Sequence, residues 1–146
     1  MKKIFICIVA LSLGFTNVSA VDAKRLPKVN CPNVLKLTTD AGWADNDVRM
    51  ADVIAFRESK CNPLAHNKTD PVTVAGVKGS LGLFQINLFW ISKTSSYPKG
   101  FLQTVLKRSL VPSDLFVPEI NVAAAEAIIE YNRDNGGCGW QAWNGC

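Results

Sequence analysis

Residues 79–87 read GSLGLFQIN, a mostly apolar segment that carries two glycines and two side-chain amides. A strand sealed inside a core would have to pair the amides of Gln85 and Asn87 within the protein, because an unpaired buried amide is costly. We therefore expect this segment to line a cleft, with Gln85 and Asn87 facing a ligand.

A helix is predicted upstream of this segment, over residues 43–63 (WADNDVRMADVIAFRESKCNP). Asp45 or Asn46 would cap its N-terminus, and Asp47 suits the positive end of the helix dipole. Asn62-Pro63 would end the helix, because proline disfavours helical geometry in the residue before it.

Glu58 falls in the last turn of this helix, on the same face as three small or apolar residues by the i, i+3, i+4, i+7 rule. Burial on that face and the negative end of the helix dipole both favour a protonated carboxyl group, which a general acid needs. The alternative is a glutamate paired with an arginine or capped by backbone amides. The apolar face comprises Ala51, Ile54 and Ala55, and the opposite polar side carries Arg49, Asp52, Arg57 and Lys60.

Asp70 is the only acidic residue between Glu58 and Asp114. Enzymes that cleave glycosidic bonds commonly use two carboxyl groups, so Asp70 is the candidate for the second. Its place in Thr69-Asp70-Pro71 favours the simpler interpretation of a turn residue.

The other elements are mostly helical. The sequence predicts a short helix over 33–39, a hairpin or irregular sheet over 71–87 with its turn near Lys78-Gly79, and a helix over 100–108. A long helix begins at Pro118 and ends near Gly136-Gly137. This balance indicates an α+β fold that is mainly α. The buried face of the long helix is expected to hold Ile120, Ala124, Ala127, Ile128 and Tyr131.

Residues 1–20 have two lysines, a short apolar run and a Val-Ser-Ala ending, which is typical of a secretory signal peptide cleaved after Ala20. A membrane anchor is the alternative, but it needs a longer apolar run. We expect a secreted or periplasmic, monomeric protein with a lead-in over 21–40 and one domain over 41–146. Without Lys2 and Lys3, 14 basic residues face 12 acidic ones. This mild excess suits an anionic polymer, while the scattered lysines argue against a nucleic acid partner.

Four cysteines remain after such cleavage, which predicts two disulfides with three possible pairings. Cys138 with Cys146 and Cys31 with Cys61 form one arrangement, and a bond from Cys31 to one of the terminal pair is the alternative. A metal site is not expected, because the chain has no CxxC pair and a single histidine, His66. No cofactor is expected either.

The order RESKCNPLAHN (57–67), GSLGLFQIN (79–87), the helix with Asn121 and a terminal GWQAW (139–143) resembles the lysozyme-like superfamily. The chain looks most like its branch of soluble lytic transglycosylases and goose-type lysozymes. In that family a Glu-Ser pair ends a central helix, an Asn-Pro follows, and a Gly-Leu-x-Gln-Ile segment forms a wall of the cleft. Here Glu58-Ser59, Asn62-Pro63 and residues 82–86 match, and the resemblance covers residues 41–146.

This resemblance implies a lysozyme-like fold with a central catalytic helix, a small β-hairpin wall and two disulfides. It implies cleavage of the β-1,4 bond between N-acetylmuramic acid and N-acetylglucosamine in peptidoglycan. A lytic transglycosylase is the leading interpretation: Glu58 acts first as acid and then as base, and the substrate's 6-hydroxyl closes a 1,6-anhydro ring without a second carboxylate. One alternative is a hydrolytic lysozyme, with water oriented by Asp70 or another acidic residue. A non-catalytic wall-binding or inhibitor module is the other.

Hydrogen-bonding groups for the sugars are expected from four residues. The wall of the cleft would supply Gln85 and Asn87, and its glycines would let the backbone approach a sugar. Ser59 and Tyr131 would act from helices, although Tyr131-Asn132 is followed by Arg133-Asp134 where the family has a small residue and glycine. Aromatic residues expected in the core rather than against a sugar are Phe84, Phe89, Trp140 and Trp143.

Overall fold

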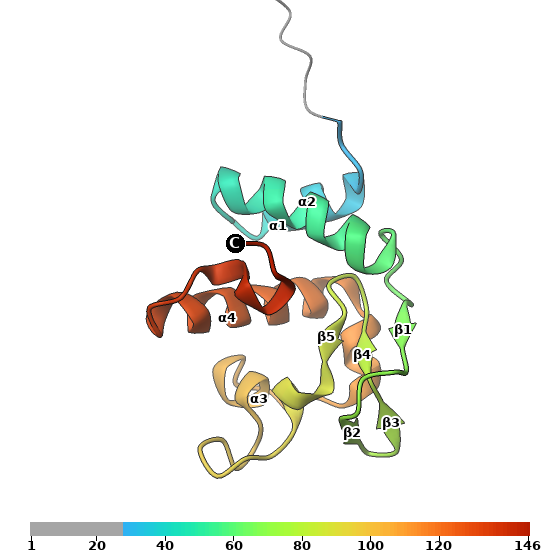
Figure 1. Ribbon diagram of the computed structural model, residues 1–146, viewed down its shortest axis with the longest axis vertical. Coiled ribbons are helices and arrows are strands. Elements are labelled where there is room, and N and C mark those ends of the chain that lie inside the picture. Colours follow the sequence, from blue (N-terminus) through green and yellow to red (C-terminus); the bar gives the residue numbers. More distant parts are fainter. Residues whose placement is uncertain (1–27) are drawn as a thin grey trace, which may run out of the picture.

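The computed structural model describes residues 28–146, so the predicted signal peptide lies outside the described residues. Helices α1 (Pro32–Asp40) and α2 (Asp45–Ser59) lie together at one end of the molecule, and the long α4 (Pro118–Asp134) runs across its middle (Figure 1). The short α3 (Phe101–Val105) lies beyond α4, and the strands stand along one side. The predicted α+β fold, mainly α, is confirmed. Three single-turn helices complete it: η1 (Leu88–Ile91), η2 (Pro112–Phe116) and η3 (Gly139–Trp143).

The bounds of α2 differ from the prediction at both ends. Its N-cap is Ala44, whose side chain makes no capping hydrogen bond, and Asp45 and Asp47 instead lie in the first turn. The helix ends before Asn62-Pro63, because Lys60 and Cys61 take left-handed backbone angles with φ of 54° and 63°. The amides of these two residues bond back to Phe56 and Ala55, which closes the helix in the usual C-terminal manner.

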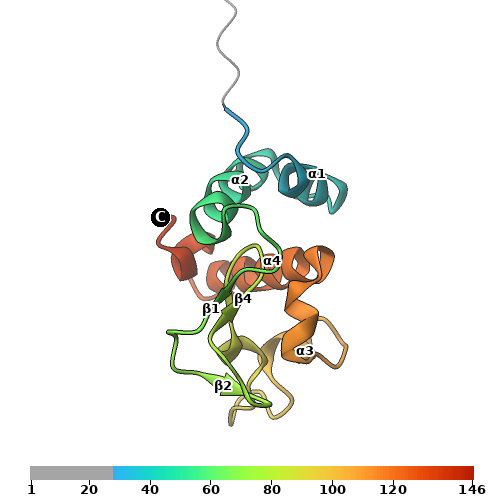
Figure 2. The ribbon, with the colours of Figure 1, turned by 90° about the vertical axis from the view of Figure 1, so that its right-hand side faces the viewer.

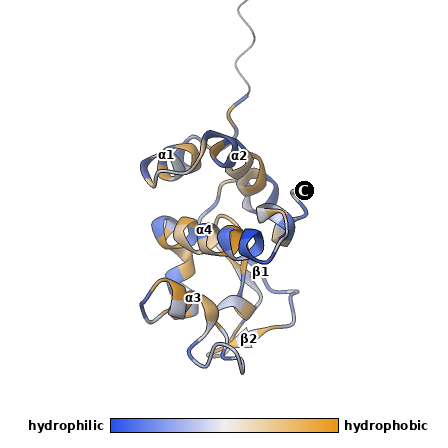
Figure 3. Ribbon diagram, turned by 90° about the vertical axis from the view of Figure 1, so that its left-hand side faces the viewer, coloured by the Kyte–Doolittle hydropathy of each residue, from blue (hydrophilic) through white to orange (hydrophobic). Residues whose placement is uncertain are grey.

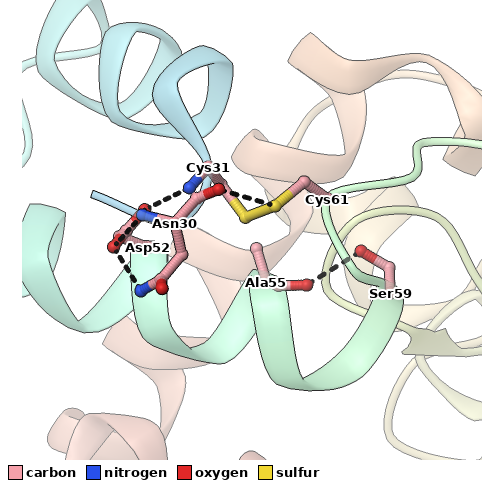
Figure 4. The surroundings of a disulfide bond; sticks show 6 residues. All are labelled: Asn30, Cys31, Asp52, Ala55, Ser59 and Cys61. Atoms are coloured by element: carbon pink, nitrogen blue, oxygen red, sulfur yellow. Dashed lines mark hydrogen bonds between the residues drawn. A yellow bond between two sulfur atoms is a disulfide. The ribbon is translucent and has the colours of Figure 1, made fainter. Parts of the chain in front are cut away.

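The disulfides join Cys31 to Cys61 and Cys138 to Cys146. Next to the first, Asp52 is only 5% exposed, although the sequence placed it on the polar side of the helix. Its carboxylate accepts hydrogen bonds from the backbone amides of Asn30 at 3.0 Å and Cys31 at 2.6 Å (Figure 4). The disulfide and Asp52 together tie the start of α1 to α2.

Helix α1 is part of the common core. Val34 and Thr38 are fully buried, and α1 packs on both α2 and α4. The part of the predicted lead-in from Pro32 onward therefore shares its core with residues 41–146.

Five two-residue strands form the β region. Strands β1 (His66–Asn67), β4 (Ser80–Leu81) and β5 (Ile86–Asn87) make an antiparallel sheet with β4 in the centre, beside α4 (Figure 2). Strands β2 (Thr73–Val74) and β3 (Val77–Lys78) form a separate hairpin. Its turn is Ala75-Gly76, so the turn predicted near Lys78-Gly79 is wrong, and β1 was not predicted.

The glycines of residues 79–87 serve the fold. Gly79 has a φ of 112°, and a Cβ there would collide with the carbonyl oxygen of Asn67 on β1. Gly82 has a φ of 80°, and a Cβ there would collide with the side chain of Asn121 on α4. The close approaches that these glycines permit are within the protein, which gives them a reason other than the expected approach to a sugar.

Asn121 is a fully buried polar residue that joins α4 to the β region. Its Oδ1 accepts a hydrogen bond from the amide of Phe84 at 2.9 Å, and its Nδ2 donates to the carbonyls of Leu81 at 3.0 Å and Leu115 at 2.7 Å. All the hydrogen-bonding capacity of the amide nitrogen is thereby used, and the turn between β4 and β5 is fixed.

The core includes a cluster of aromatic side chains, in which Trp140 and Trp143 are 5% and 6% exposed and Phe84 is fully buried. These three residues are core, as predicted. On α4, Ala124, Ala127 and Ile128 are buried as expected, whereas Ile120 and Tyr131 are only half-buried. The C-terminal end of the helix is hydrophilic (Figure 3). Within residues 28–146, no helix is both long enough and apolar enough to span a bilayer.

Candidate functional site

A cleft of about 340 Å³ lies between the end of α2, the β sheet and η3. It brings together Glu58, Gln85 and Asn87, which were predicted to share a site, and adds Asp70. Ser59 and Tyr131 do not line it. The remaining lining residues are Asn67, Ser80, Ile86, Trp90, Ile128, Ala142, Trp143 and Asn144.

Glu58 is half-buried, with 26% of its side chain exposed. Its Oε1 accepts hydrogen bonds from Nη2 of Arg57 at 2.8 Å and from Nε at 3.0 Å. The same Nη2 also donates to the carbonyl of Trp143. The expected burial on an apolar face is thus only partial, and the pairing with an arginine matches the alternative interpretation. Arg57 fixes the carboxylate and attaches η3 to α2.

Asp70 reaches the cleft from the loop between β1 and β2. Its carboxylate accepts a hydrogen bond from Oγ of Ser80 on β4, and its side chain is half-buried. The site therefore holds two carboxyl groups on different elements, one paired with a guanidinium and one with a hydroxyl. The sequence favoured a turn residue for Asp70. Its hydrogen bond with Ser80 could not be predicted, because it forms only once the chain returns from the hairpin of β2 and β3 to β4.

Gln85 lines the cleft, but most of the hydrogen-bonding capacity of its side-chain amide is used within the protein. Its Nε2 donates to the carbonyls of Ala65 at 3.1 Å and Gly82 at 2.9 Å, and its Oε1 accepts from the amide of Asn67 at 3.1 Å. Only one lone pair of Oε1 is left for a ligand. Gln85 is polar chiefly because it holds β1 against the turn between β4 and β5.

Asn87 is better placed to meet a ligand. Its Oδ1 caps η1 by accepting from the amide of Phe89 at 2.8 Å. Its Nδ2 donates no hydrogen bond to any of residues 28–146. The side chain therefore offers two N–H donors at the wall of the cleft.

Ser59 and Tyr131 lie elsewhere. Ser59 is 8% exposed, and its hydroxyl donates to the carbonyl of Ala55 in its own helix at 2.9 Å. Tyr131 lines a neighbouring pocket of about 390 Å³, where its ring packs against Trp90 and Phe101 with centroid distances of 5.7 and 4.9 Å.

Trp90 was not among the predicted site residues. It lines both the cleft and this neighbouring pocket. Phe89, expected in the core, is 50% exposed and also lines the neighbouring pocket. A signal was present in the sequence: these aromatic residues directly follow the amide-bearing segment 79–87. The two hollows share Trp90 and Ala142, so they lie next to each other.

One carboxyl group outside the cleft is perturbed. Burial raises the pKa of Glu126 on α4, the nearby indole N–H of Trp43 lowers that pKa by a smaller amount, and the charge of Glu130 raises it. The indole N–H is buried and makes no hydrogen bond with good geometry among the described residues, so burial is the main cause of the shift. Among the described residues, no group of three or more histidine, cysteine, aspartate or glutamate side chains could hold a metal ion.

A family model described as a lysozyme-like domain matches residues 35–145, most of the chain. The chain belongs to this family. A lysozyme-like domain implies peptidoglycan as the substrate and cleavage of a glycosidic bond as the class of reaction.

A solved structure supports the same assignment for this lysozyme-like domain. The crystal structure of a lysozyme from Litopenaeus vannamei is 26% identical, covers 77% of this chain and 78% of its own, and superimposes with a TM-score of 0.52. Among curated proteins, no sequence matches the chain.

Proposed function

We propose that this protein hydrolyses the β-1,4 bond between N-acetylmuramic acid and N-acetylglucosamine in peptidoglycan. The observation that carries this proposal is the presence of two carboxyl groups, Glu58 and Asp70, in one cleft of a lysozyme-like domain. Proton donation to the leaving oxygen and stabilisation of the sugar cation are separate tasks, and two carboxyl groups can divide them.

Glu58 is the proton donor in this mechanism. It lies in the last turn of α2 and lines the cleft, and Arg57 holds its carboxyl group in position. A glycan that enters the cleft displaces water from around Glu58 and brings its glycosidic oxygen to the carboxyl group. Glu58 then protonates the glycosidic oxygen as the bond to the departing sugar breaks.

Asp70 is the second carboxylate. Ser80 donates a hydrogen bond to its Oδ2, which leaves Oδ1 free of this bond. A carboxylate in this place can stabilise the positive charge that develops on the sugar or activate a water molecule. Asn87 supplies donors to the N-acetyl sugars, and Trp90 supplies an apolar face.

A lytic transglycosylase is the second candidate. The sequence favoured it because no partner acid for Glu58 was evident, and the position of Asp70 removes that reason. The half-burial of Glu58 still suits it, since a single glutamate can serve in turn as acid and base.

The decisive experiment digests purified peptidoglycan with the wild-type protein, with Glu58→Gln and with Asp70→Asn, and weighs the products. Hydrolysis yields reducing ends that carry one added water, and both substitutions should lower the rate by about 100-fold or more. Glu119→Gln and Asp45→Asn are matched controls, because both side chains are exposed outside the cleft.

Each other outcome contradicts a part of the proposal. Anhydro ends, with Asp70→Asn fully active, would assign a transglycosylase. Full activity of Glu58→Gln would overturn the site. Tight binding without any product would assign a wall-binding or inhibitor module.

We also propose that the protein acts outside the cytoplasm as a monomer. Its two disulfides are compatible with a secreted or periplasmic protein, because such bonds persist in oxidising compartments.

A further inference from the structure

A second groove, of about 760 Å³, lies at the α3 end of the molecule, away from α1 and α2 (Figure 1). One rim is the loop between η1 and α3, which supplies Lys93 and Lys99, and the other is the segment after α3, which supplies Lys107 and Arg108. No acidic residue lines this basic groove. The fold thus brings Lys93 and Lys99 close to the consecutive residues Lys107 and Arg108.

The side chain of Gln103 fixes the two rims relative to each other. Its Nε2 donates to the carbonyl of Ile91 at 3.1 Å, and its Oε1 accepts from the amide of Leu110 at 3.2 Å. Gly100 has a φ of 97°, and a Cβ there would be 2.6 Å from the carbonyl oxygen of Ile91. The separation of the rims is therefore set by internal contacts.

The charges of the groove are not neutralised within the protein. All four cationic side chains are exposed, and none of them forms an ion pair among residues 28–146. With two cations on each rim, the groove attracts a linear anion that passes between them. The guanidinium of Arg108 can also bind two oxygens of one phosphate at once.

We propose that the basic groove binds a phosphodiester polymer of the cell wall. The residues that line it argue against two other anionic partners, a single-stranded nucleic acid and a lipid surface. It contains no aromatic side chain on which bases could stack, as single-stranded nucleic acids require. It also contains none of the exposed large apolar side chains that insert into a lipid surface.

The choice of a wall polymer rests on the proposed function. The loop that carries Lys93 and Lys99 also supplies Ser92, Thr94 and Tyr97 to the pocket that contains Tyr131. This pocket shares Trp90 and Ala142 with the cleft. A polymer held in the groove would thereby keep the cleft close to the glycan strands to which such polymers are attached.

The test measures the binding of poly(glycerol phosphate) to the full protein by calorimetry at several salt concentrations. Lys99→Gln/Arg108→Gln removes one cation from each rim, and we expect its affinity to fall by about ten-fold or more. The slope of log affinity against log salt should become shallower by about 1.5, since each neutralised phosphate contributes roughly 0.7–0.9. Lys36→Gln/Lys68→Gln loses the same net charge outside the groove and should bind almost as the wild type does.

Equal loss in the two double variants would overturn the proposal, because it would show that net charge alone drives binding. Tighter binding of single-stranded DNA with the same number of phosphates, or of vesicles containing anionic lipid, would assign the groove to those partners instead. Equal binding of inorganic phosphate would reduce it to a small-anion site. Circular dichroism confirms that each variant is folded.

Failure of the groove and failure of the proposed function are distinguishable. Cleavage of peptidoglycan glycan strands that carry no phosphodiester polymer should be unchanged in Lys99→Gln/Arg108→Gln, since its substitutions lie outside the cleft. Turnover without polymer binding contradicts only the groove, and polymer binding without turnover contradicts only the function.

Discussion

The side chain of Asn121 on α4 accepts a hydrogen bond from the backbone amide of Phe84, 37 residues earlier in the chain. The two carbonyls that receive its Nδ2 protons lie on β4 and η2, so one buried amide joins three elements. The turn that carries Gln85 to the cleft is thereby anchored to the core.

Asn121→Leu should strongly destabilise the protein. The leucine keeps the volume but leaves the amide of Phe84 and two carbonyls without their partner, and each unpaired buried group costs about 1–3 kcal/mol. We expect the free energy of unfolding to fall by about 3 kcal/mol or more, measured by urea denaturation. Asn33→Leu, on the exposed face of α1, provides a comparison, and an equal effect there would contradict this role.

Asp52→Ala should detach the start of α1. The carboxylate is 5% exposed and receives hydrogen bonds from two backbone amides and from Nδ2 of Asn30. Hydrogen bonds to charged groups contribute about 1.5–3 kcal/mol each, so we expect a loss of about 3 kcal/mol in chemical denaturation.

Asp40→Ala is the matched control for Asp52→Ala. Asp40 is exposed and pairs only with Lys36 in its own helix, and such a surface pair contributes less than about 1 kcal/mol. Similar losses in the two variants would show that Asp52 is an ordinary surface carboxylate.

Glu126 should make stability depend on pH. Because burial raises its pKa above the ordinary 4.5, the folded protein holds this proton more tightly than the unfolded chain does. Stability should therefore fall as the pH rises from about 4.5 through the raised pKa.

Glu126→Gln should remove this loss, so its Tm should exceed that of the wild type at neutral pH and approach it near pH 4.5. Thermal unfolding over a series of pH values measures the difference. Glu119→Gln, on an exposed part of the same helix, should show no such gain. A wild-type Tm that rises steadily across this window relative to Glu126→Gln would reverse the sign and refute the assignment.

Gln85→Ala and Asn87→Ala should separate structural support from substrate binding. Gln85 makes three hydrogen bonds to backbone groups, so its loss should cost about 2 kcal/mol of stability. Asn87→Ala removes the cap of η1, at about 1 kcal/mol, but it also removes the free Nδ2 donors. We expect Asn87→Ala to raise the KM for peptidoglycan fragments several-fold, and a KM unchanged from that of the wild type would count against its role in binding.

The periodic parts of the fold were predictable from the sequence. The spacing of apolar residues identified α2 and α4 and placed Glu58 at a helix end. Trp140 and Trp143 were assigned to the core because small proteins with disulfides commonly bury tryptophan there. The β region was not predictable in detail, because strands of two residues are too short to show an alternating pattern. The turn at Ala75-Gly76 was consequently misplaced.

Contacts between distant parts of the chain could not be predicted from the sequence either. Asp52 was assigned to the polar side of α2 because its partners lie 21 and 22 residues away. Asp70 looks like a turn residue until Ser80 and the cleft are seen together. The partners of Gln85 likewise come from β1 and from its own turn.

The tail of the chain completes the cleft, because Ala142, Trp143 and Asn144 line it and the carbonyl of Trp143 is held by Arg57 beside Glu58. A polypeptide is synthesised from its N-terminus, so this wall is the last part of the site that can form. Any local unfolding that releases residues 139–143 also dismantles the cleft, so the stability of the site is no greater than that of the tail.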